Sequence, residues 1–76
     1  MSKKLIRTPY VHVEKGWPVV IAGGLGDSCW SPYLLKPNGS LQRCCYFKCR
    51  WTSKAALLDL RVYMTSPGRK FLREAA

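Results

Sequence analysis

Residues 33–51 read YLLKPNGSLQRCCYFKCRW, and this stretch decides the expected fold. Asn38-Gly39 readily supplies the two positive φ angles of a type I′ turn, which predicts a β-hairpin. The second strand is expected to run to Trp51, with alternating side chains. The set expected to face the core is Leu41, Arg43, Cys45, Phe47, Cys49 and Trp51. The set on the other face is Gln42, Cys44, Tyr46, Lys48 and Arg50.

Two β-rich runs precede the hairpin, at residues 10–14 and 17–22. Because Pro18 cannot donate a ladder hydrogen bond, the second of these strands is expected to start at Val19 or to lie at an edge. Lys15-Gly16 is a plausible turn between them. Together with the hairpin, these runs predict a β-meander of three to four strands.

After Trp51 the apolar residues recur at the three- to four-residue spacing of an α-helix. Thr52 or Ser53 is a suitable N-cap for a helix over residues 54–64. The stripe expected to pack on the sheet is Ala56, Leu60, Tyr63 and Met64, with Leu57 beside it. Ser66-Pro67 is expected to end this helix and to start a short second one over residues 67–75.

These patterns predict an α+β domain, in which a small antiparallel sheet packs against one C-terminal helix. Seventy-six residues suffice for one domain only. Residues 1–8 are expected to form a flexible basic arm, and residues 9–76 the single domain.

Charge gives the clearest functional indication. Thirteen Lys and Arg residues against four acidic residues leave a net charge of +9, so most cations must be unpaired on the surface. Such a surface attracts polyanions, although charge also serves solubility alone. Partners are therefore expected among nucleic acids or acidic protein surfaces.

Other classes of function have weaker signals. His12 is the only histidine and the acids are scattered, so we expect no enzyme, no small-molecule substrate and no cofactor. Cys44 and Cys45 would point to opposite faces of a strand, which argues against a metal site. Buried thiols at Cys45 and Cys49 are expected; a zinc site or a disulfide is the alternative. No signal peptide or membrane span is evident, so we expect a cytoplasmic protein with reduced thiols.

The polar face of the long strand is the main candidate site, because it places an aromatic ring among cations. The residues expected to bind nucleic acid are Gln42, Tyr46, Lys48 and Arg50 on this face, with Lys3, Lys4 and Arg7 in the arm. An ordinary exposed strand face is the alternative interpretation.

The order of strands, hairpin, basic strand and a helix opening at Thr52 resembles the small N-terminal DNA-binding domains of phage integrases. The resemblance covers roughly residues 10–64 as a pattern of elements and implies a sheet that enters the major groove. The chain is also similar to small phage accessory proteins, a group that includes anti-CRISPR inhibitors.

That second similarity implies the alternative function, an inhibitor that blocks a host protein or ribonucleoprotein complex by direct contact. Trp30 and Tyr33 are the expected protein-contact residues, because exposed aromatic side chains often anchor interfaces. A homodimer is compatible with the sequence. Membrane binding through residues 69–73 is disfavoured, because that apolar face is small.

Overall fold

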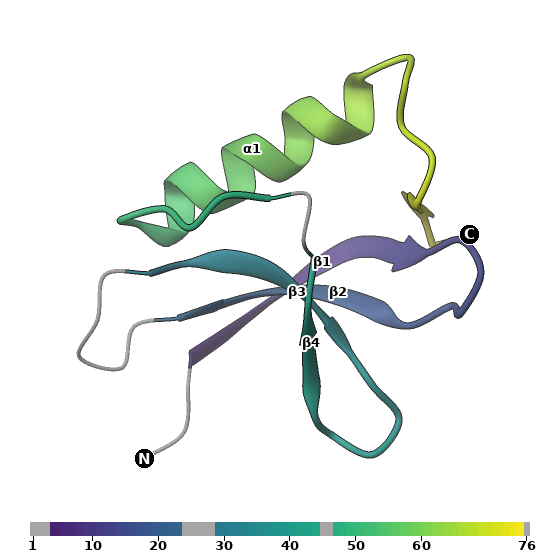
Figure 1. Ribbon diagram of the computed structural model, residues 1–76, viewed down its shortest axis with the longest axis horizontal. Coiled ribbons are helices and arrows are strands. Elements are labelled where there is room, and N and C mark those ends of the chain that lie inside the picture. The colour runs from purple at the N-terminus through teal and green to yellow at the C-terminus, as the bar shows by residue number, and fades with distance from the viewer. Residues whose placement is uncertain (1–3, 24–28, 45–46, 76) are drawn as a thin grey trace.

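A computed structural model describes residues 4–23, 29–44 and 47–75. Five antiparallel strands form one sheet in the order β4-β3-β2-β1-β5, and one helix lies over one side of it (Figure 1). The elements are β1 (Lys4–His12), β2 (Pro18–Gly23), β3 (Ser31–Leu35), β4 (Leu41–Arg43), α1 (Ser53–Thr65) and β5 (Leu72–Glu74). The predicted α+β class is confirmed, but the sheet has five strands where three to four were expected. The only helix in the described part of the chain is too short to span a membrane.

Helix α1 forms as its sequence predicts. The Thr52 hydroxyl accepts a hydrogen bond from the Ala55 N–H at 3.1 Å, which caps the first turn. Ala56, Leu60 and Met64 are buried, at positions that share one face of the helix. They pack in one cluster with residues of β2, β3 and β5, namely Val19, Ile21, Leu34 and Leu72.

The β3–β4 hairpin is confirmed, but its turn is not of type I′. Gly39 has a φ of 89°. In the described ranges only glycines have a positive φ, so Asn38 does not adopt the second positive φ that a type I′ turn requires. The Lys36 carbonyl accepts from the Gly39 N–H, and the Lys36 N–H donates to the Ser40 carbonyl, both at 2.9 Å. This is the pattern of a three-residue loop with glycine in the left-handed region.

The strand expected to extend to Trp51 ends at Arg43 instead. Cys44, which we expected on the polar face, is 2% exposed in the core, and its N–H donates to the Pro32 carbonyl in continuation of the β3–β4 pairing. Phe47 is buried as expected, but Cys49 is exposed and Trp51 is 80% exposed, so neither belongs to the core. The regular alternation predicted for this stretch was therefore wrong beyond β4.

The expected second helix is wrong as well, because residues 72–74 form β5, which pairs with Tyr10–His12 of β1. Local contacts direct the chain back to the sheet. The Tyr63 hydroxyl accepts from the Lys70 and Phe71 N–H groups at 3.1 Å, and Arg69 donates to the Met64 carbonyl at 3.0 Å. Leu72 then enters the core with 2% of its surface exposed.

Replacing Tyr63 with phenylalanine is expected to lower the free energy of unfolding by about 0.5–1.5 kcal/mol, because two N–H groups lose their acceptor. Water can reach both groups, which keeps the loss modest. Urea unfolding measures the change, and hydrogen exchange should become faster at Lys70 and Phe71. Tyr10→Phe is the matched control, because Tyr10 also packs against the core but its hydroxyl makes no hydrogen bond within the described ranges. An equal loss in both variants would contradict the assignment.

Strand β1 begins at Lys4, so residues 4–8, which we expected in a flexible arm, lie in the sheet. Its register with β2 shifts between Arg7 and Val11. Thr8 spans this irregularity: its hydroxyl donates to the Val19 carbonyl at 2.7 Å and accepts from the Tyr10 N–H at 3.3 Å. A side chain thus replaces the ladder hydrogen bonds where the two strands are out of register.

Candidate binding surface on the open face of the sheet

The structure does not assemble the predicted polar strand face. Gln42 lies in β4, whereas Lys48 and Arg50 lie beyond its end, on the segment that leads to α1. Arg50 forms an isolated antiparallel bridge with Trp30, and its guanidinium lies 3.4 Å from the Asp59 carboxylate. Lys3 and Tyr46, the other two residues of this prediction besides the β1 cations, lie outside the described residues.

The two aromatic residues predicted to contact protein are both half-buried. Trp30 packs against the core cluster, so it is not the exposed anchor that we expected. Tyr33 lies in β3 on the side of the sheet away from α1, because it alternates with the buried core residue Leu34. Trp51 is the exposed tryptophan instead.

We call the side of the sheet opposite α1 the open face. The strand registers place one residue from each of four neighbouring strands in a single row across it. The row runs Arg7 (β1), Val20 (β2), Tyr33 (β3) and Arg43 (β4). Val20 is 1% exposed, so it forms the floor of the row, whereas both arginines are exposed. Because neighbouring strands lie about 4.8 Å apart, the backbones of Arg7 and Arg43 are separated by about 14 Å.

Further cationic and apolar groups border this row. Beside it, Leu35 pairs with Leu41, and Val11 pairs with Pro18 on one side and with Arg73 on the other. Arg73 is exposed, at the β5 edge of the open face. Among the described acids, Glu14 lies in the β1–β2 turn, Asp59 is on α1, and Glu74 alternates with Arg73 and points to the other face. The described strands therefore present cations and an aromatic ring on the open face, without a carboxylate.

Sequence reasoning named Arg7 and Tyr33 but missed the surface that they share. It assigned Leu41 and Arg43 to the core because the alternating set that contains them is mainly apolar, and the alternation itself is correct within β4. The face was reversed: Leu41 and Arg43 lie on the open face with Tyr33. The pairing of Tyr33 with Arg43 follows from the length of the hairpin loop, which is the signal that would have placed Arg43 correctly.

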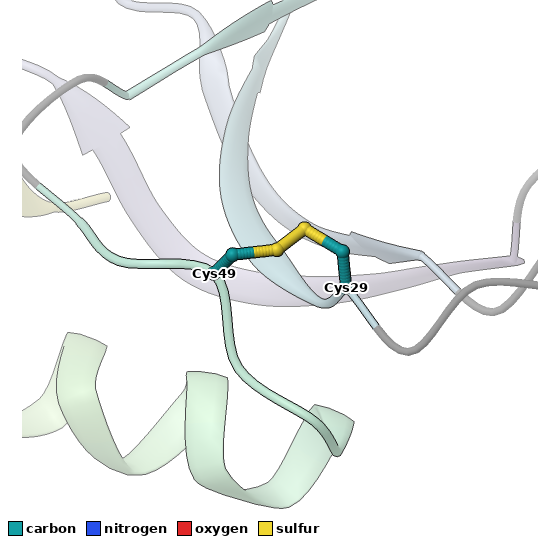
Figure 2. Close-up of a disulfide and its surroundings, with 2 residues drawn as sticks. All are labelled: Cys29 and Cys49. Atoms are coloured by element: carbon teal, nitrogen blue, oxygen red, sulfur yellow. A yellow bond between two sulfur atoms is a disulfide. The ribbon is translucent and has the colours of Figure 1, made fainter.

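The cysteines differ from the expected buried thiols. Cys29 and Cys49 form a disulfide that joins the start of the β3 region to the segment before α1 (Figure 2). Their Cα atoms are 5.2 Å apart, inside the range of about 4.4–6.8 Å that disulfides require. Cys45 lies outside the described residues. No group of three His, Cys, Asp or Glu side chains in the described ranges is arranged to hold a metal ion.

The surface of the described residues includes the following two hollows. The first, of about 330 Å³, is lined by Cys29, Cys49, Arg50 and Trp51. The second, of about 460 Å³, lies between α1 and the segment before it, and its lining includes Lys48, Arg50, Asp59 and Val62. His12 is in neither: its Nδ1 accepts hydrogen bonds from the Glu14 and Lys15 N–H groups, so it stabilises the β1–β2 turn.

Comparisons with protein-family models, with curated proteins and with solved structures found no match to this chain.

Proposed function

We propose that this chain is a small basic protein that binds nucleic acid, without catalysis, through the open face of its sheet. The row of Arg7, Tyr33 and Arg43 is the observation that carries the proposal. Guanidinium groups bind phosphate oxygens, and an aromatic ring between them offers a base a surface for stacking. Arg73 extends the cationic surface at the β5 edge, whereas Lys4 pairs with Gly23 and points to the α1 side of the sheet.

Single-stranded nucleic acid fits this arrangement better than a duplex does. Only unpaired bases can leave their own stack and lie on a protein ring such as Tyr33. The apolar residues near the ring that reach the surface, Leu35 and Leu41, suit the faces of bases rather than a continuous phosphate backbone, whereas Val20 is buried beneath the row. We propose a cytoplasmic location, in which case the Cys29–Cys49 pair would be mostly reduced, since cytosolic thiol systems keep most cysteines reduced.

Binding of a fluorescent 12-nucleotide single strand should weaken steeply with salt, because phosphate contacts release counterions. With three arginines on the open face, log K against log salt is expected to have a slope of about −2, at about −0.7 per contact. Replacing Arg7 and Arg43 with alanine should remove about two thirds of that slope. Fluorescence anisotropy across a salt series measures both quantities.

The matched control replaces Lys54 and Arg61, two exposed cations of α1 on the other side of the molecule. This variant loses the same charge, so general electrostatic attraction alone would weaken binding equally in both double variants. Equal losses, or a slope near zero for the unmodified protein, would refute the proposed interface.

A second candidate function is blocking of a host protein or ribonucleoprotein by direct contact. It is favoured by Trp51, which is 80% exposed, and by Leu58 and Val62 on the outer side of α1, which are 60% and 61% exposed. Tryptophan is enriched among the residues that dominate binding energy in interfaces. A stoichiometric protein complex that survives nuclease treatment and is lost on Trp51→Ala would support this candidate over the first.

A further inference from the structure

The N-terminal half of β1 is an edge of the sheet. Strand β2 pairs with Lys4–Arg7 on one side, whereas β5 pairs on the other side with Tyr10–His12 only. Within the described part of the chain, no strand pairs with residues 4–8 on that second side. Figure 1 shows this end of β1 at the rim of the sheet, away from α1 and β5. Its outward backbone N–H and C=O groups can therefore pair with another strand.

The side chains of this edge have a distinct order: a cation, two apolar residues and a second cation. Lys4 and Arg7 are exposed, and Leu5 and Ile6 expose 47% and 39% of their surface. Exposed apolar residues beside unpaired backbone groups favour the addition of a strand, and flanking charges select which strand is accepted.

A second copy of this chain is a poor partner for the edge. Two-fold antiparallel pairing of two such segments sets residues of the same face opposite each other, so Lys4 would meet Ile6 or Arg7 would meet Leu5, and neither cation would meet a carboxylate. The whole chain carries a net charge of +9, so two copies repel each other.

We propose that this edge binds an extended peptide segment of a partner protein with the pattern acidic–apolar–apolar–acidic. The segment adds a strand to β1 on the same edge as β5, next to the point where the Ala75 N–H donates to the Pro9 carbonyl at 2.8 Å. Its acidic residues lie opposite Lys4 and Arg7, and its apolar residues lie opposite Leu5 and Ile6. Backbone hydrogen bonds supply affinity, and the side chains supply selectivity, as in other cases of strand addition.

The pattern follows from pairing distances. Residues directly opposite each other in neighbouring antiparallel strands have Cβ atoms about 4.5–5.5 Å apart, so every side chain of the added segment contacts one partner on β1. Two opposite-charge pairs and two apolar pairs then form together. The pattern acidic–apolar–apolar–acidic is the same from either end. A segment added parallel to β1 would therefore also bring acidic residues near Lys4 and Arg7 and apolar residues near Leu5 and Ile6.

The test uses synthetic peptides with a Glu-Val-Val-Glu core, fluorescently labelled and titrated with the whole protein. A peptide with a Lys-Val-Val-Lys core is expected to bind at least about tenfold more weakly, because two attractive pairs become repulsive. A Glu-Val-Val-Glu peptide with N-methylated valines should also lose binding, since methylation removes the backbone donors. Hydrogen exchange at residues 4–8 should slow only when the unmethylated acidic peptide is bound.

A double variant, Lys4→Glu with Arg7→Glu, should exchange the preference and bind the basic peptide in place of the acidic one. This gain cannot arise from a loss of folding, so the test remains decisive if the variant is somewhat destabilised. Equal binding of acidic and basic peptides, retained binding after N-methylation, or no slowing of exchange at residues 4–8 would each overturn the proposal.

Arg43→Ala separates this site from the proposed nucleic-acid surface. Arg43 lies in β4, at the opposite edge of the sheet, so its loss should weaken nucleic-acid binding and leave peptide binding unchanged. Loss of peptide binding in this variant would contradict a site at the β1 edge.

Discussion

Replacing Leu60 with alanine is expected to lower the free energy of unfolding by about 2–5 kcal/mol, one of the two largest effects that we predict. Leu60 is 0% exposed, and its cluster includes Val19, Ile21 and Leu34 of the sheet. Truncation leaves a cavity between α1 and the sheet that the neighbouring strands can fill only in part. A domain of this size has about 4–11 kcal/mol of stability in total, so the variant should be partly unfolded near physiological temperature.

Urea unfolding followed by circular dichroism measures this loss. Leu58→Ala is the matched control, because it makes the same change two positions away on α1 at a side chain that is 60% exposed. The free energy of unfolding of this variant should differ from that of the unmodified protein by no more than about 0.5 kcal/mol, as for most surface substitutions. Similar losses in the two variants would mean that α1 does not pack on the sheet through Leu60.

Removing the Cys29–Cys49 disulfide is the second large change. The bridge closes a loop with a sequence separation of 20, for which the chain-entropy estimate is about 3 kcal/mol. The double variant Cys29→Ser with Cys49→Ser should lose about this amount under oxidising conditions. Thermal or urea unfolding with and without reductant measures the difference, and reduction of the unmodified protein should make two further thiols available for alkylation.

Reductant supplies the control for this prediction. With the disulfide reduced, the unmodified protein and the double serine variant should have nearly equal stability. An equal stability without reductant, or no gain in alkylated thiols on reduction, would show that the pair is not bridged. The same measurement bears on location, since cytosolic thiol systems keep most cysteines reduced.

Elements with strong local signals were predicted correctly from the sequence. Thr52 and the stripe of Ala56, Leu60 and Met64 define α1 without any knowledge of its neighbours, because cap and period are both local. Asn38-Gly39 located the hairpin, although the turn uses a positive φ at Gly39 alone. For the turn of the hairpin, the position was predicted correctly and only the type was wrong.

Elements stabilised by distant contacts could not be predicted in this way. Residues 72–74 contain helix formers, yet Leu72 pairs with His12, 60 residues earlier, and burial of Leu72 outweighs local propensity. The candidate site has the same limit. Arg7 and Arg43 are brought into one row only by the registers of three strand pairs, and a reversal of face moves every side chain of a strand together.

The pairing of the first strand with the last has a consequence for synthesis. On the ribosome β1 emerges early, but the strand that covers Tyr10–His12 is added only after α1 has been made. Until then the nascent chain exposes the full length of that edge, which is when chaperone binding or misassembly competes with folding. Contacts between residues far apart in sequence, such as those of β1 with β5, also slow refolding, because the entropy of closing the long loop is lost before the strand pair is stabilised.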